Sequence, residues 1–127
     1  MNYSLHHVHL ICRDLEKMIR FFKDDIGAKF VKRRKFGTAD GAMLDLQGIC
    51  INLRVSRDGE EIRENLVLST YGYDHIGLQV EDVQAAYEEL TERGYSFFKP
   101  PTESAGSMIA FFKGPENITI ELIQPIT

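Results

Sequence analysis

Two histidines at matching places in an internal repeat are the residues of this chain best suited to bind a metal ion. His7 and His75 each start an alternating apolar run, and each precedes an aspartate, Asp14 or Asp82, by seven residues. They lie 68 residues apart in a chain of 127, which indicates an internal duplication. Glu121 lies on the polar side of the last expected strand. Two histidines and a carboxylate that converge on one hollow would form a three-ligand metal site with open positions.

Further polar side chains share the expected faces of these strands. His9 lies two residues after His7 and can contact substrate or transfer a proton. Asp45 is a candidate general base or a charge at the rim of the pocket, and Glu121 is a second candidate for the proton transfer. Asn52 lies 69 residues before Glu121, in the corresponding strand, and would be either a fourth ligand through its carbonyl oxygen or a residue of the pocket wall.

Two more residues complete the expected substrate site. Arg54 alternates onto the same face as Asn52, and Gln79 alternates onto the same face as His75. We expect His9, Asn52, Arg54 and Gln79 to contact a small-molecule substrate.

The first repeat has the pattern of a strand, a helix and three strands. Residues 5–12 alternate in polarity, and Asp14 is a suitable helix N-cap. A helical stripe of apolar residues follows and ends at Gly27, a typical C-terminal residue; the stripe consists of Leu15, Met18, Ile19 and Phe22. Three strands are expected at residues 29–36, 41–47 and 49–55.

The second repeat has the same order. A strand at residues 75–80 precedes the N-cap Asp82 and a helix that Gly94 ends; its apolar stripe consists of Val83, Ala86, Tyr87 and Leu90. The next strand is expected at residues 95–99, where Pro100 and Pro101 should stop it. Two more strands, at residues 107–113 and 118–124, flank a turn at residues 114–117.

These patterns predict an α+β fold. Two tandem βαβββ modules, at about residues 1–55 and 72–127, would form a cupped, partly closed mixed sheet with the helices on its convex side. Residues 56–71 are charged and loop-like, apart from the short apolar run Leu66, Val67 and Leu68, and are expected to link the modules within one domain.

Composition excludes several classes of protein. The net charge of −4 gives no general reason to expect nucleic acid as a partner. No apolar run approaches the roughly 20 residues that a transmembrane helix needs, and the N-terminus lacks the apolar core of a signal peptide. Cys12 and Cys50 are too few for a disulfide framework. A cytoplasmic protein with reduced thiols and no membrane partner is the simplest interpretation.

The chain resembles the vicinal oxygen chelate superfamily, which includes glyoxalase I, methylmalonyl-CoA epimerase, extradiol dioxygenases and metal-free bleomycin-resistance proteins. Three features carry the resemblance: the duplicated unit, the histidine–aspartate spacing, and the closing run GPENITIEL at residues 114–122. The resemblance implies one glyoxalase-like domain over residues 1–127. It also implies that His7, His75 and Glu121 are the metal ligands, with Asn52 where glyoxalase I and the epimerase carry a fourth ligand. Asp45 resembles in position the proposed base of the epimerase.

We therefore expect a metal-dependent lyase or isomerase of the glyoxalase or epimerase type. A divalent metal (zinc, nickel, cobalt, manganese or iron) would chelate two oxygens of a small carbonyl substrate and stabilise the enolate that forms when a base removes the adjacent proton. Two alternatives remain open. One is a non-haem iron dioxygenase, which uses the same ligand types, and the other is a metal-free small-molecule binding or resistance protein. The resemblance and the open sheet edges also predict a homodimer.

Overall fold

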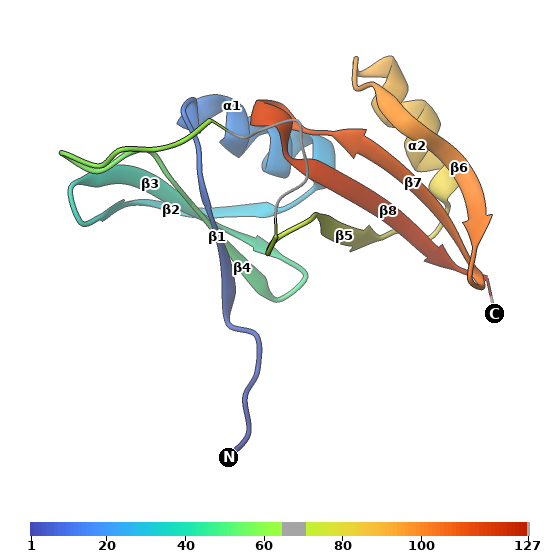
Figure 1. Ribbon diagram of the computed structural model, residues 1–127, viewed down its shortest axis with the longest axis horizontal. Helices are drawn as coiled ribbons and strands as arrows, with labels where there is room; N and C mark the ends of the chain where they lie inside the picture. The colour runs from blue at the N-terminus through green and yellow to red at the C-terminus, as the bar shows by residue number, and fades with distance from the viewer. Residues whose placement is uncertain (65–70, 127) are drawn as a thin grey trace. The chain divides into compact units, whose positions relative to one another are not determined.

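The computed structural model describes residues 1–64 and 71–126. The chain divides into two compact units, Met1–Glu64 and Asn65–Thr127, and each is described here by itself (Figure 1). The run Leu66, Val67 and Leu68, part of the expected linker, lies outside the described residues. Among the helices described, none is long and apolar enough to span a bilayer.

The first unit is a four-stranded mixed sheet with one helical segment. Strand β1 (His7–Ile11) runs parallel to β4 (Ile49–Arg54), and β3 (Ala39–Leu46) and β2 (Lys29–Phe36) continue the sheet with antiparallel pairs, so the order is β1-β4-β3-β2. Helix α1 (Leu15–Arg20) follows β1 and passes directly into a π-helix, η1 (Phe21–Ile26).

The second unit repeats this topology. Strand β5 (Ile76–Gln79) runs parallel to β8 (Thr119–Pro125), and β7 (Ser107–Lys113) and β6 (Phe97–Ser104) complete the order β5-β8-β7-β6. Helix α2 (Val83–Glu92) lies along one face of this sheet (Figure 1). A short 3-10 helix, η2 (Pro115–Asn117), stands where the sequence predicts a turn. The predicted α+β class and the two βαβββ units are confirmed, and each unit has its own four-stranded sheet.

The strand register confirms that the two halves correspond residue by residue. His9 lies opposite Asn52 in the first unit, and Gly77 lies opposite Glu121 in the second. Asn52 and Glu121 therefore hold the same place in the repeat, and His9 corresponds to Gly77. His7 is the first residue of β1. His75 comes directly before β5, because this strand starts at Ile76, one residue later than the sequence predicts.

Both helices begin as the sequence predicts. Asp14 Oδ1 accepts a hydrogen bond from Lys17 N at 3.1 Å, and Asp82 Oδ1 accepts one from Ala85 N at 3.1 Å; such caps typically stabilise a helix by about 1 kcal/mol. The helices bury their apolar stripes against one face of each sheet. The most buried large side chains include Phe21, Phe22, Met18, Leu44 and Leu53 in the first unit, and Phe112, Ile120, Leu122 and Val83 in the second.

One expectation about these elements is wrong, and one helix differs in type. Pro100 and Pro101 do not stop a strand, because β6 continues through them to Ser104. This strand is at the edge of its sheet, and its register shifts on both sides of Lys99; an irregular edge strand tolerates residues that cannot donate a ladder hydrogen bond. The first helical segment ends at a left-handed Gly27, as predicted, although it is a π-helix from Phe21 to Ile26.

Candidate functional site

A histidine and a glutamate meet on the polar face of the second sheet. His75 Nε2 lies 2.9 Å from Glu121 Oε1, and on the other side of the ring His75 Nδ1 lies 2.7 Å from Asp74 Oδ2. Glu121 lies on β8, opposite Gly77 of β5. The structure thus brings together two of the three predicted metal ligands.

The surroundings of His75 favour its charged form. The hydrogen bond to Asp74 raises the pKa of His75, partial burial works against this rise, and the hydrogen bond to Glu121 adds to it. Both side chains are largely shielded, with 29% of His75 and 17% of Glu121 exposed. The ring of Phe111 packs edge-on against the imidazole at 5.2 Å between centroids. A carboxylate with so little exposure needs a partner, and here the partner is the imidazole.

The polar face of the first sheet carries the other predicted residues. His7, Cys50 and Asp45 lie opposite one another on neighbouring strands, and His9 lies opposite Asn52 in the next row. His7 and His9 are exposed, with ring centroids 6.2 Å apart. Next to the strand, the Nδ1 atoms of His6 and His7 lie 2.9 Å apart. The expected sharing of one face by His7, His9, Asp45 and Asn52 is confirmed.

Two of these polar residues are buried and satisfied within the first unit. Asn52 is 8% exposed, and its Oδ1 accepts a hydrogen bond from Cys50 Sγ at 3.2 Å. Arg54 is 6% exposed, and its two Nη atoms donate to the two carboxylate oxygens of Glu60 at 2.7 and 2.9 Å. The arginine lowers the pKa of Glu60 to about 2. Asn52 as a ligand, and Arg54 as a substrate contact, stay predictions.

The other three predicted site residues differ in exposure and surroundings: they are Asp45, Gln79 and His9. Asp45 is half-buried on β3, between Cys50 of β4 and Lys29 of β2. Gln79 is exposed at the end of β5. Burial lowers the pKa of His9, and the nearby charges of Arg54, His7, Arg57 and Arg34 lower it further.

A metal bound by His75 and Glu121 needs a further ligand. Among the described parts of the chain, no three His, Cys, Asp or Glu side chains gather into a group that could hold a metal ion. The pair itself fits a divalent ion, because imidazole nitrogen and carboxylate oxygen are its usual ligands. Asp74 on Nδ1 is the kind of outer partner that fixes a ligating imidazole. His7 is the remaining predicted ligand, and its role stays a prediction.

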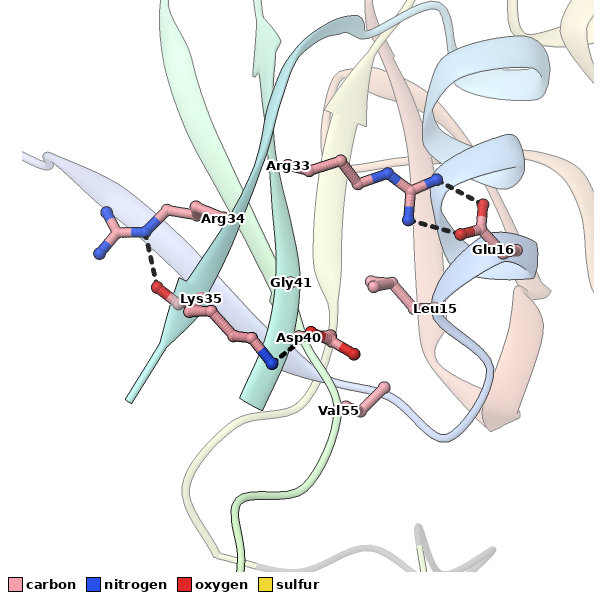
Figure 2. A pocket seen from close by; sticks show the side chains of 8 residues that line it. All are labelled: Leu15, Glu16, Arg33, Arg34, Lys35, Asp40, Gly41 and Val55. Carbon is pink, nitrogen blue, oxygen red and sulfur yellow. Dashed lines mark hydrogen bonds and ion pairs between the residues drawn. The ribbon is translucent and has the colours of Figure 1, made fainter. Parts of the chain in front are cut away.

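A cavity in the first unit is lined by residues of helix α1 and strands β2 and β3, together with Val55. It has a volume of about 460 Å³, with the apolar side chains of Leu15 and Val55 beside two ion pairs (Figure 2). Arg33 forks onto Glu16 of α1, and Lys35 reaches Asp40. Arg33 and Lys35 are paired with carboxylates, while the third cationic side chain of the lining, Arg34, bonds the carbonyl oxygen of Lys35 through its Nε.

Sequence reasoning missed Asp74 and Glu60. Asp74 has a local signal, a carboxylate directly before a candidate metal-binding histidine. Glu60 has no comparable signal, because its role depends on how the loop after β4 returns its carboxylate to Arg54.

With this geometry established, comparison with known proteins identifies the family. The profile of the Glyoxalase/Bleomycin resistance protein/Dioxygenase superfamily matches residues 4–122. The chain belongs to this superfamily, which confirms the resemblance found in the sequence.

Three similar proteins illustrate the relationship. Glyoxylase I 4 of Arabidopsis thaliana is 26% identical over 121 residues, which cover 94% of this chain and 69% of that protein. Lactoylglutathione lyase GLX1 of Arabidopsis thaliana is 28% identical over 127 residues and 92% of this chain, and the chain spans 43% of that protein's length. The crystal structure of a glyoxylase/bleomycin resistance protein/dioxygenase domain from Frankia sp. EAN1pec matches with a TM-score of 0.79 at 26% identity, over 98% of this chain and 99% of that one.

Proposed function

We propose that this protein is a metal-dependent lyase or isomerase of the glyoxalase type, with His7, His75 and Glu121 as the metal ligands. The contact of His75 Nε2 with Glu121 Oε1 at 2.9 Å is the observation that carries this proposal. It presents one nitrogen and one oxygen donor at the same point of the polar face. The similarity to a lactoylglutathione lyase supports the lyase class.

The chain's own residues would share the work of a proton transfer. When bound, the metal would supply Lewis-acid polarisation of two oxygens on a small carbonyl substrate. Asp74 keeps the imidazole of His75 oriented through Nδ1. Glu121, Asp45 and His9 are the candidate groups to accept the substrate proton. Asn52, Arg54 and Gln79 would line the substrate site, with Asn52 and Arg54 preorganised by their hydrogen bonds.

Metal analysis of variants tests this function. His7→Ala, His75→Ala and Glu121→Ala should each lower the metal content sharply, because each leaves two protein ligands for the ion. His9→Ala should keep the metal and alter turnover or substrate affinity. Elemental analysis of protein purified without chelators measures the metal, and circular dichroism checks the fold. Glu103→Ala is a matched control, an exposed glutamate of the same unit on the edge strand β6.

A metal-free binding protein is the second candidate function. The observation that favours it is that His75 and Glu121 already satisfy each other through a hydrogen bond. Wild-type protein that holds no divalent ion after reconstitution would overturn the enzyme proposal in favour of this one. An iron dioxygenase is distinguished by a different result: activity that iron alone restores and that disappears without oxygen.

A further inference from the structure

An aromatic ring on the polar face of the first sheet gathers two arginines and a histidine. The ring of Phe36 lies over Gly41, where an added Cβ would come within 2.5 Å of it. The guanidinium carbon of Arg34 stands 4.3 Å from the ring centroid, and the imidazole of His9 lies 4.5 Å from it. Arg57 Nε donates to the Phe36 carbonyl oxygen at 3.1 Å. Phe36 thus contacts Arg34 and His9 through its ring and Arg57 through its carbonyl oxygen.

Both arginines keep donors available for a ligand. Arg34 Nε donates to Lys35 O at 3.1 Å, and Arg57 uses its Nε for Phe36. Within the described residues, the Nη atoms of both side chains make no hydrogen bond, and both side chains are exposed. Since guanidinium carries five N–H donors, each retains a pair that can bind two oxygens of one anion.

The carboxylate nearest Arg57 is already committed to another arginine. Glu60 is occupied by the fork from Arg54 and by the backbone N–H of Arg57. Asp45 lies on the same face, two rows of the sheet away from Gly41 and Arg34. The charges of Arg34 and Arg57 therefore remain without an ion-pair partner in the described parts of the chain.

The neighbouring arginine shows the contrast. Arg33 projects from β2 toward helix α1 and forms a two-bond fork with Glu16, whereas Arg34 extends in the opposite direction (Figure 2). One strand thus carries a neutralised arginine on its helix side and an available one on its polar side. Arg33 therefore provides a matched control for Arg34.

We propose that His9, Arg34 and Arg57 form a binding site for an anionic group, the carboxylate or phosphate of a small-molecule ligand. Planar guanidinium forks match the oxygens of both groups. The second unit has no equivalent, since Gly77 stands where the first unit has His9. The site does not depend on the proposed metal, because none of its three residues is a proposed ligand.

Anion titration followed by NMR tests the site. Inorganic phosphate, and separately acetate, is added to isotope-labelled full-length protein at constant ionic strength, with chloride as the balancing anion. We expect saturable shifts of the Arg34 and Arg57 side-chain Nε–H signals with phosphate, with acetate or with both. Arg34→Gln or Arg57→Gln should weaken this binding about tenfold, the loss of a charge-assisted contact. Arg33→Gln should leave it unchanged.

Two further variants separate anion binding at this site from binding to a metal ion and from loss of the fold. Phosphate can also bind a metal ion, so His75→Ala is titrated in parallel, and the Arg34 and Arg57 shifts should persist in it. Arg34→Lys, which keeps the charge at an exposed position, should bind more tightly than Arg34→Gln even if Arg57→Gln fails to fold. Acetate binding alone would indicate a carboxylate ligand, and phosphate binding alone would indicate a phosphate ligand. The proposal is overturned if neither anion gives saturable shifts, or if Arg33→Gln weakens binding as much as Arg34→Gln.

Discussion

At the residue scale, Asp74 is the group expected to tune the proposed metal ligand His75. Its carboxylate fixes Nδ1 of the imidazole, so that Nε2 faces Glu121. If the metal site is as proposed, Asp74→Ala should lower metal affinity by roughly 10- to 100-fold without unfolding the protein. Competition with a chromogenic chelator measures the affinity. Glu81→Ala is the control, because Glu81 is an exposed carboxylate between β5 and α2. Equal affinity in Asp74→Ala and wild type would contradict the role given to Asp74.

The ion pair between Arg54 and Glu60 makes stability depend on pH. Arg54, and also the backbone N–H of Arg57, lower the pKa of Glu60 from its ordinary value of 4.5 to about 2. The folded-state pKa is therefore below the unfolded one, so the pair stabilises the fold above about pH 4.5 and this contribution disappears as the pH falls toward 2. Glu60→Gln should lower the melting temperature at neutral pH, because it leaves the buried Arg54 without its carboxylate.

Thermal melts at several pH values measure this effect. The difference in melting temperature between wild type and Glu60→Gln should shrink as the pH approaches 2. The neighbouring exposed Glu61 provides a matched control, and Glu61→Gln should behave like wild type. A difference that stays constant from neutral pH to about pH 2 would show that the pair does not stabilise the fold in this way.

At the element scale, strand β3 needs a glycine at position 41. A Cβ there would lie 2.4 Å from Leu53 O and 2.5 Å from the ring of Phe36. Gly41→Ala should therefore push the ring aside and destabilise the protein by about 1–3 kcal/mol, as overpacking does. Chemical denaturation measures the loss. Gly77→Ala is the matched control, because its nearest neighbour would be Glu121 Oε1 at 3.5 Å, an ordinary contact. Equal stability of both variants would contradict this account of Gly41.

Sequence patterns predict elements well where the pattern is local. The caps at Asp14 and Asp82, and the alternation that buries Leu44 and exposes His9, follow from neighbouring residues alone. The π-helix from Phe21 to Ile26, in which Phe21 and Phe22 are both buried, has no such local signal in the sequence. Likewise, the passage of β6 through its prolines depends on its position at an edge, which only the pairing of strands decides.

The candidate site shows the same division. The pairing of His75 with Glu121 could be predicted, because the sequence places them in the expected first and last strands of the second module and alternation gives their faces. The cluster of Arg34 and Arg57 could not, because a hydrogen bond across 21 residues, from Arg57 to Phe36, brings them together. Long-range contacts of this kind leave no periodic trace in the sequence.

At the scale of the whole molecule, the sheet edges bear on the predicted homodimer. The outer strand β2 carries five Lys or Arg residues and β6 carries two prolines, devices that discourage pairing with another strand. The opposite edges, β1 and β5, have neither a lysine or arginine nor a proline. We expect a second copy of the chain to cover the edge at β1, where apolar side chains are exposed.

The predicted homodimer can be tested on one edge strand at a time. Light scattering at high micromolar concentration should give twice the chain mass of 14.5 kDa. Ile11→Lys should shift the protein toward the monomer, because Ile11 on β1 is 45% exposed and a charge there opposes burial at an interface. Val31→Lys is the matched control, an apolar residue 53% exposed on the cationic edge strand β2, and should leave the mass unchanged. A wild-type protein that stays monomeric rules the dimer out, and dissociation caused by Val31→Lys instead of Ile11→Lys places the interface on the opposite edge of the first sheet.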